Sequence, residues 1–252
     1  MKYLIAFVVI VSSHLADEKL TNNWTAFPVG SSIEFEEKSA WNKNAKPSTN
    51  KQKTFIKEHR SNGSTTLETQ ILKDGKWKRL KGALVIGYSI AKMKLTKDSE
   101  KKETLKIAGK KYPVKKIVFK GMDGKTPIQV TFWVSDKVKL FERTMSQWQS
   151  SALVRIPPNA LKAQIIRKSN VDLFSEREVV ALDEKIKIGK KSVSSFKVKI
   201  SSWQVTKGKE TNRSSYHSWL SSKVPGYRVK MEGGVRPTKW VSTTGYKIVE
   251  KK

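Results

Sequence analysis

The sequence predicts a mostly β protein: an antiparallel, strongly curved sheet, open barrel or sandwich, built from two related halves and containing little helix. Three observations lead to this fold class. Short segments alternate apolar and polar residues with a period of two. Turns containing Gly, Asn or Asp separate these segments, and strong helix start and stop signals are nearly absent. Part of the chain also occurs twice.

The duplicated part has two anchors. Residues 103–111 return as residues 184–191, and residues 133–138 return as residues 219–224. Between the anchors, residues 117–119 match residues 196–198. The spacing between the copies grows from 81 to 86 residues, which is too long for a solenoid unit and is typical of a duplicated β-meander. We therefore predict a first β-rich repeat over residues 17–150 and a second over residues 151–252.

The first sixteen residues read as a secretory signal peptide. Lys2 precedes an apolar run over residues 3–11, and the small residues Ser13 and Ala16 offer two cleavage points. A buried N-terminal strand is the alternative. We expect export to the periplasm or the cell exterior. The chain has no cysteine, so its stability must come from the core alone.

The first half contains several strand and turn signals. Ile33 and Phe35 alternate with glutamates in a short strand, and residues 39–53 predict a mobile basic loop. The turn Asn62-Gly63 predicts a hairpin between residues 54–59 and 65–73, and the turn at residues 74–75 leads into residues 77–80. Residues 83–95 favour a bent strand over a helix because Gly82 precedes them and Gly87 lies within them.

The later elements follow the same pattern. A turn at residues 123–124 precedes the clearest half-buried strand, residues 128–134. The boundary between the halves is placed within residues 146–160, and residues 160–168 fit either a short helix or a strand. Three further strands, over residues 184–188, 196–200 and 227–231, alternate apolar residues with basic ones.

The case for an enzyme is poor. After removal of the signal only His59 and His217 remain, with no cysteine and no neighbouring histidine to form a metal set. No Gly-x-Ser-x-Gly elbow occurs. Glu34, Glu36 and Glu37 could act as paired carboxylates, but charge balance among many lysines explains them. We predict no catalytic residue, metal or cofactor, with an unrecognised hydrolase as the remaining enzymatic alternative.

The charge points to an anionic partner. The chain has 51 basic and 22 acidic residues, a formal net charge of +29. Export and the lack of a stacking platform disfavour nucleic acid. An anionic membrane or an acidic polymer remains, and ordinary solvated lysines are the plain alternative. The predicted contact residues, which share one face in this prediction, are Lys185, Lys187, Lys197, Lys199, Arg228 and Lys230.

Two tryptophans suggest a second kind of partner. Trp133 alternates with Phe132, and Trp219 with Leu220, so both faces of these strands carry large apolar groups. One face packs on the core, and the other would line a cavity for a lipid or an acylated ligand. Alternatively, each tryptophan lies at a strand end and packs under a loop or under the sister copy.

The order of these segments resembles a known family. The segments 133–138 and 219–227, each beginning with Trp and a Ser two residues later, are similar to the strand-turn-strand of periplasmic half-barrel proteins related to lipoprotein carriers (LolA/LolB-like). The resemblance implies a curved antiparallel sheet around an apolar cavity that holds lipid or acylated protein. This chain departs from that family in its duplication and its high positive charge.

The predicted function is that of an exported, non-enzymatic binding protein of the cell envelope. It would hold an apolar or amphiphilic ligand, or dock on an anionic surface. The alternative is a structural or interaction protein of the envelope that has no ligand cavity.

Overall fold

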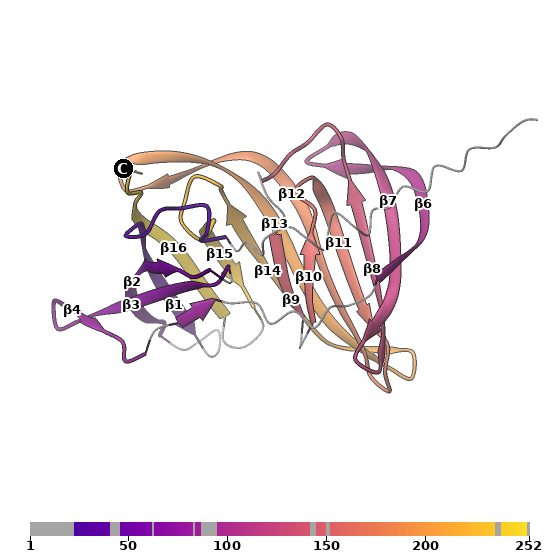
Figure 1. Cartoon of the computed structure of the whole chain (residues 1–252), viewed down its shortest axis with the longest axis horizontal. Helices are drawn as coiled ribbons and strands as arrows, with labels where there is room; N and C mark the ends of the chain where they lie inside the picture. The colour runs from indigo at the N-terminus through magenta and orange to yellow at the C-terminus, as the bar shows by residue number, and fades with distance from the viewer. Residues whose placement is uncertain are drawn as a thin grey trace, which may run out of the picture.

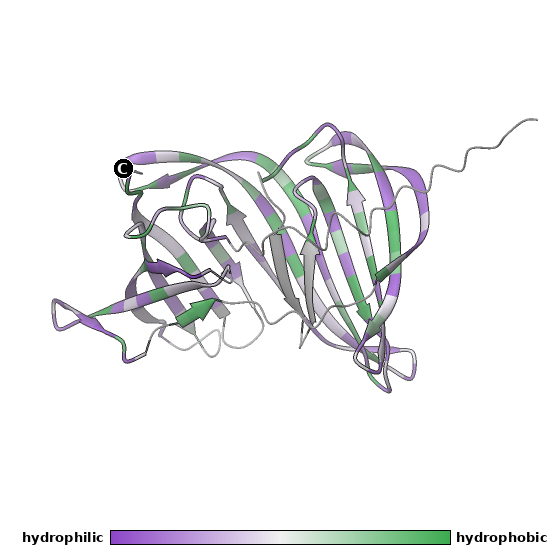
Figure 2. Cartoon of the chain, viewed as in Figure 1, coloured by the Kyte–Doolittle hydropathy of each residue, from purple (hydrophilic) through white to green (hydrophobic). Residues whose placement is uncertain are grey.

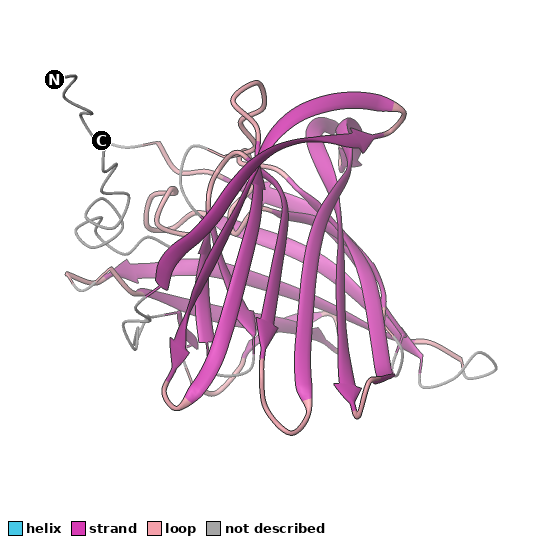
Figure 3. Cartoon of the chain, turned by 90° about the vertical axis from the view of Figure 1, so that its right-hand side faces the viewer, coloured by secondary structure: helices cyan, strands magenta, loops and turns pink. Residues whose placement is uncertain are grey.

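A computed structural model describes residues 23–40, 46–61, 63–82, 84–86, 95–141, 145–149, 152–234 and 238–250. The described residues form strands, turns and loops without a helix (Figure 3). The strands are β1 Ser32–Ala40, β2 Ser48–His59, β3 Thr65–Lys73, β4 Lys76–Arg79, β5 Leu84–Ile86, β6 Leu95–Ile107, β7 Lys110–Asp123, β8 Thr126–Val134, β9 Met145–Gln149, β10 Ala152–Ile156, β11 Ala160–Arg167, β12 Asp172–Ile188, β13 Lys191–Thr206, β14 Lys209–Leu220, β15 Arg228–Gly233 and β16 Thr238–Lys247.

Fourteen of these strands form one antiparallel sheet (Figure 1). Its order is β4-β3-β2-β1-β16-β15-β14-β13-β12-β11-β8-β7-β6, with β5 paired to β3 beside this path. The chain therefore enters the sheet at β1, runs outward to the β4 edge, resumes at the β6 edge and returns to β16. Pairing of β1 with β16 joins the first and last strands into the middle of the sheet. This confirms the predicted curved antiparallel architecture with little helix.

Local turn chemistry explains where the strands end. Asp74, Gly75 and Gly124 have positive φ angles, as tight hairpin turns require, and they lie at the predicted β3–β4 and β7–β8 connections. Residues 160–168, which fitted either a helix or a strand, are largely strand β11. Ile165 there pairs with Val130 of β8, so its β-branched side chain packs on a sheet face rather than on a helix.

Two predicted loops contain strands. Residues 48–53, expected in a mobile basic loop, form the start of β2 and pair with β1. Their side chains are polar and mostly exposed, so the segment lacks the apolar alternation that signals a strand, and pairing alone orders it. The expected boundary at residues 146–160 contains the β9–β10 hairpin, and β8 and β11 on either side pair directly. The division into two repeats at residue 150 stays a prediction.

The core follows the alternation along each strand, visible as green and purple bands (Figure 2). A large apolar cluster includes Val130, Ile165, Val179 and Val198, which neighbouring strands place on one side of the sheet. A smaller cluster contains six buried residues from β1, the β12–β13 hairpin, β14, β15 and the loop between the last two, namely Ile33, Ile188, Val193, Trp219, Val224 and Val229.

The longest hairpin bends over the sheet. β12 has register shifts between Val179 and Glu184, and Asp183 has a positive φ of 58°. Beyond this irregularity the tip reaches β16, where Gly189 faces the backbone of Thr244 and the Lys191 ammonium lies 5.4 Å from the Tyr246 ring centroid. β6 likewise contacts β12, which is three strands beyond its own partner β7. The bent hairpin therefore helps to bury the smaller cluster.

We expect Gly226→Ala to destabilise the fold strongly. Gly226 has a φ of +73°, and a Cβ there would lie 2.6 Å from the Trp24 ring. The matched control is Gly124→Ala, where φ is +62° and no atom lies within 4 Å. Both changes incur a backbone cost of about 1–2 kcal/mol, and the steric overlap with Trp24 adds about 1–3 kcal/mol at residue 226 alone.

Urea unfolding of the two variants measures this difference. Equal losses of unfolding free energy would show that Trp24 does not pack against the Pro225–Gly226 turn.

Candidate functional site

Strand pairing places both repeat tryptophans on the same side of the sheet. Directly paired residues of adjacent strands share a face. One row of pairs across β7, β8, β11, β12, β13, β14, β15, β16 and β1 consists of Lys116, Trp133, Lys162, Glu178, Lys199, His217, Glu232, Trp240 and Lys38. A second row consists of Lys197, Trp219, Lys230, Ser242 and Glu36. We call this side the tryptophan face and the other side the opposite face.

Each repeat tryptophan is bonded to a glutamate two strands away. The Trp133 Nε1 on β8 donates to Glu103 Oε2 on β6 over 2.9 Å. The Trp219 Nε1 on β14 donates to Glu184 Oε2 on β12 in the same way. Because β7 and β13 lie between these partners, each indole reaches across one strand. These bonds tie the hairpins β6–β7 and β12–β13 to the tryptophan face.

Two lysines flank each indole. The ammonium groups of Lys116 and Lys162 lie 5.0 and 5.4 Å from the Trp133 ring centroid. Those of Lys197 and Lys230 lie 4.7 and 4.6 Å from the Trp219 ring centroid. A cation above an aromatic face is attracted by the ring quadrupole, and the lysine stems cover apolar surface. The rings are consequently buried although their neighbours are charged.

The carboxylates complete these clusters electrostatically. Lys101 lies 2.5 Å from Glu103 and donates a hydrogen bond to it. This bond is the largest influence on Glu103, followed by the one from Trp133, and together they lower the pKa of its carboxyl. An ionised carboxylate is the stronger acceptor for an indole N–H, so the charge state and the geometry support each other.

The connections that follow β8 and β14 also correspond. Ser135 and Ser221 each accept a hydrogen bond of 3.3 Å from the backbone N–H two residues later. The strand that pairs with each of them, β11 beside β8 and β15 beside β14, has a register shift next to the tryptophan. Leu161 of β11 and Val229 of β15 consequently have no paired residue across this boundary. That the two segments arose by duplication stays a prediction.

The pairings correct one part of the predicted alignment. Ile117 pairs with Phe132, the residue before Trp133, whereas Val198 pairs with Ser218, the residue before Trp219. Residues 117–119 thus correspond to residues 198–200, so the match with residues 196–198 is wrong by two residues. Short apolar strings are degenerate, and only the pairing with the tryptophan strand defines their register.

The four candidate ligand residues are packed inside the protein. Phe132, Trp133 and Leu220 are at most 7% exposed and belong to the large cluster. Trp219 is 5% exposed and lies in the smaller cluster with Ile188 of the bent hairpin. Trp133 and Phe132 face opposite sides of β8, as Trp219 and Leu220 do in β14, and each tryptophan lies one residue before its strand ends. A ligand cavity at these residues stays a prediction.

The six candidate basic residues do not share one face. Lys197, Lys199 and Lys230 lie on the tryptophan face. Lys185 and Lys187 pair with Ser194 and Ser192, which alternate with Lys197 along β13 and so lie on the opposite face. Arg228 pairs with Leu220, also on the opposite face. Register shifts in β12 and beside Trp219 exchange the side of the sheet that successive residues face. Alternation within single strands therefore assigned Lys185, Lys187 and Arg228 to the wrong face.

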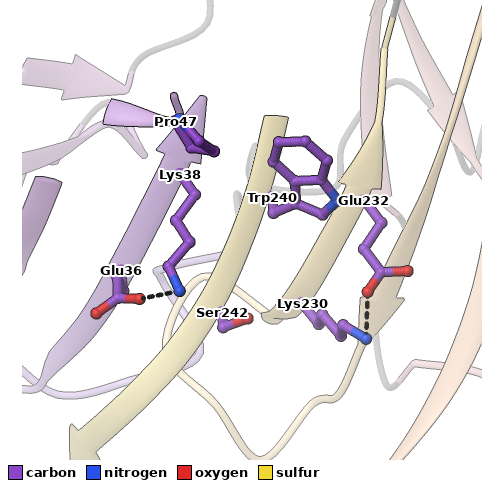
Figure 4. A pocket seen from close by; sticks show the side chains of 7 residues that line it. All are labelled: Glu36, Lys38, Pro47, Lys230, Glu232, Trp240 and Ser242. Carbon is purple, nitrogen blue, oxygen red and sulfur yellow. Dashed lines mark ion pairs between the residues drawn. The ribbon is translucent and has the colours of Figure 1, made fainter. Parts of the chain in front are cut away.

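An open depression of about 510 Å³ lies on the tryptophan face (Figure 4). Its floor is a block of two paired rows on β1, β16 and β15, and its lining comprises Glu36, Lys38, Pro47, Lys230, Glu232, Trp240 and Ser242. Lys38 pairs with Glu36 over 3.2 Å, and Lys230 pairs with Glu232. The two ion pairs flank the half-exposed Trp240 ring. The depression therefore presents an exposed aromatic ring between two ion pairs whose charges cancel.

Both histidines among the described residues have neighbours that explain their positions. His59 Nε2 donates to the Phe27 carbonyl over 2.8 Å, and its Nδ1 contacts the Thr65 hydroxyl at 3.1 Å, so it joins β2 to the segment before β1. His217 lies beside the Trp219 ring. Within the described ranges no three His, Asp or Glu side chains gather as metal ligands would. The prediction of a non-enzymatic protein remains a prediction.

Sequence reasoning missed Glu103, Glu184 and Trp240. The two glutamates begin the repeated segments at the same position, and that coincidence was the available signal for a shared role. Trp240 carried no such signal, because its partners Lys38 and Glu232 lie on strands that no local pattern joins to it.

We expect Trp219→Phe to lower the free energy of unfolding by about 1–2 kcal/mol, because Phe keeps a ring but removes the bond to Glu184. A double-mutant cycle with Glu184→Ala should give a coupling of about 1 kcal/mol, and the cycle of Trp133→Phe with Glu103→Ala should agree in sign. The control is the half-exposed Trp77, whose change to Phe should matter little. Zero coupling in both cycles would contradict the assigned bonds.

We expect His217 to make the fold less stable in acid. Burial, followed by the charges of Lys197 and Lys199, lowers the pKa of its imidazole, while Glu232 and Glu184 oppose this. The unfolded chain therefore takes up the proton first as the pH falls. Stability is complete above the ordinary pKa of 6.5 and declines as the pH drops from there through the lowered pKa.

Urea unfolding at pH 7.5 and pH 5.5 tests this, with His217→Gln as the comparison. The native protein should lose more stability between these pH values than the variant. Identical losses would refute the effect.

Two solved structures are similar to this chain. No protein-family model matches the sequence, and no curated protein matches it. A protein from Bacteroides fragilis assigned as exported, with a YmcC-like fold, aligns with a TM-score of 0.36 and 10% identity over 90% of this chain and 98% of its own. A protein from Parabacteroides distasonis assigned as a lipoprotein aligns with a TM-score of 0.35 and 12% identity over 88% and 98%. Similarity at this level does not define a family for this chain.

Proposed function

We propose that this chain is an exported, non-enzymatic protein of the cell envelope that docks on an anionic surface. The observation that carries the proposal is the concentration of unneutralised lysines on two hairpin tips. Residues 185–191 carry four lysines and no acidic residue, and residues 104–111 carry three lysines and no acidic residue.

The tip lysines are available to a partner. Lys185, Lys187 and Lys190 of the β12–β13 tip are exposed, as are Lys106, Lys110 and Lys111 of the β6–β7 tip. Across the described ranges none of these six side chains forms an ion pair, whereas lysines on the strands such as Lys38, Lys53 and Lys120 do. The two glutamates nearest the tips, Glu103 and Glu184, are bonded to the tryptophans. The positive charge of the tips is therefore not cancelled locally.

Physical chemistry favours a surface partner for such tips. Each basic group near an anionic membrane contributes on the order of 1 kcal/mol, and the attraction extends over about one Debye length. The bond from Trp219 to Glu184 anchors the base of the β12–β13 tip, so little ordering is needed on contact. Docking by this anchored tip therefore costs less conformational entropy than docking by lysines on a mobile segment.

The same contacts support surface docking over ligand storage. Phe132, Trp133, Trp219 and Leu220 are buried in packed clusters, and none of them lines the open depression. His59 and His217 have neighbours that explain them without catalysis. The candidate export signal lies within residues 1–16, outside the described residues. Among the described residues there is no helix with the length and hydropathy needed to cross a bilayer.

Vesicle binding tests the proposal. The mature protein should co-sediment with vesicles containing acidic phospholipid, should not co-sediment with zwitterionic vesicles, and should dissociate as salt rises. Replacing Lys185 and Lys187 by Gln should weaken binding on the order of tenfold.

The matched control removes the same charge elsewhere. Lys120 and Lys168 are also exposed but pair with Asp98 and Asp172 at 2.9 and 2.7 Å. Their replacement by Gln should weaken binding much less than the tip variant. Equal weakening would indicate an attraction due to net charge alone, and absence of binding to acidic vesicles would refute the proposal.

A further inference from the structure

The β3–β4 hairpin forms one end of the sheet and projects beyond it (Figure 1). Its strands meet at the turn Asp74-Gly75, with Leu72 opposite Trp77 and Lys73 opposite Lys76. Leu72 and Trp77 therefore share one side of the hairpin, next to its tip.

This hairpin and the adjoining β5 expose an unusual amount of apolar surface. Nine large hydrophobic side chains are exposed among the described residues, and five of them lie between residues 72 and 85. These five are Leu72 at 37%, Trp77 at 40%, Leu80 at 39%, Leu84 at 60% and Val85 at 43% exposure. Single exposed apolar residues are ordinary, but Leu72 and Trp77 are directly paired on one side of the projecting hairpin and so form a contact surface. Leu84 pairs with Leu67 and lies on the other side.

The apolar group is surrounded by cations. Residues 72–81 contain five basic residues and one acidic residue, giving a local charge of +4. Asp74 pairs with Lys78 over 3.3 Å, and Arg79 pairs with Glu68 over 3.0 Å. Lys73, Lys76 and Lys81 form no ion pair within the part of the chain that the structure describes.

We propose that the β3–β4 hairpin is a membrane-docking arm for bilayers that carry acidic lipids. Trp77 and Leu72 enter the interfacial region together, and Lys73, Lys76 and Lys81 contact the headgroups. Tryptophan prefers the interface between water and hydrocarbon, while long cationic side chains extend toward anionic headgroups. This inference rests on the proposed function and names the element that determines which anionic surface is bound.

Edge protection and polymer binding would each use only part of this hairpin. Lysines protect an edge strand from pairing with another chain, but that role does not require an exposed Trp77 beside Leu72. An acidic polymer in water would pair with the lysines, yet it would gain little from the adjacent side chains of Leu72 and Trp77. An acidic bilayer uses both the cations and the apolar side chains at once.

The first experiment compares two double variants for binding to vesicles with and without acidic phospholipid. The hairpin variant is Leu72→Ser with Trp77→Ser, and the matched control is Met122→Ser with Ile248→Ser, which are exposed apolar residues outside the hairpin. The hairpin variant should bind acidic vesicles about tenfold or more weakly than the control. Near-ultraviolet circular dichroism confirms that both variants are folded.

A second measurement locates the contact directly. Because the chain has no cysteine, one can be introduced at Leu72 and labelled with a fluorophore that shifts to the blue in an apolar environment. The reference site is Lys209, which is exposed beside the β13–β14 turn. Acidic vesicles should shift the emission at residue 72, and a water-soluble quencher should lose access there, with neither change at residue 209.

The outcomes separate the arm from the proposed function. Loss of binding on replacing Lys185 and Lys187, together with normal binding by the hairpin variant, would overturn the arm and keep the anionic-surface function. Binding to an acidic polysaccharide that is insensitive to Leu72 and Trp77, without vesicle binding, would also overturn the arm. Absence of binding to every anionic surface would overturn both.

Discussion

The hydrogen bond between each repeat tryptophan and a glutamate two strands away is the interaction on which the tryptophan face depends. Trp133 reaches Glu103 over β7, and Trp219 reaches Glu184 over β13. Each bond fixes a hairpin relative to the strand that follows it, and flanking lysines shield the indole. An amphipathic tryptophan suits this position because its ring needs burial while its N–H needs an acceptor.

The bonded tryptophans divide the charges of the protein into two classes. Lysines such as Lys197 and Lys230 cover an indole, so they act within the fold. Three lysines at the β12–β13 tip, Lys185, Lys187 and Lys190, cover no indole among the described residues and present their charge to the solvent. The net charge of +29 is thus not equally accessible over the whole protein. The elements proposed to contact an anionic surface carry lysines that form no ion pair among the described residues.

The proposed docking elements combine these charges in different ways. The β12–β13 tip offers cations without large exposed apolar groups, since Ile188 and Val193 are buried. The β3–β4 hairpin offers cations together with Trp77 and Leu72. Long-range attraction and interfacial insertion would therefore come from separate parts of the sheet, which is why variants of each part can be told apart experimentally.

The sequence by itself determined what depends on neighbours along the chain. Alternation predicted the strand at residues 128–134, and the turns at residues 74–75 and 123–124 marked hairpins, because backbone preference and side-chain period are local. The repeated anchors also mark Trp133 and Trp219 as corresponding residues. Polar residues 48–53 escaped this reasoning because their strand is ordered by pairing alone.

Only the tertiary structure decided which residues meet. Lys38, Trp240 and Glu232 form one row although residues 38 and 240 lie at opposite ends of the chain. The phase of Lys185 relative to Lys197 depends on register shifts in β12 that no single-strand pattern encodes. A shift of one residue exchanges the two faces of a strand, so the faces follow from long-range pairing and not from local alternation.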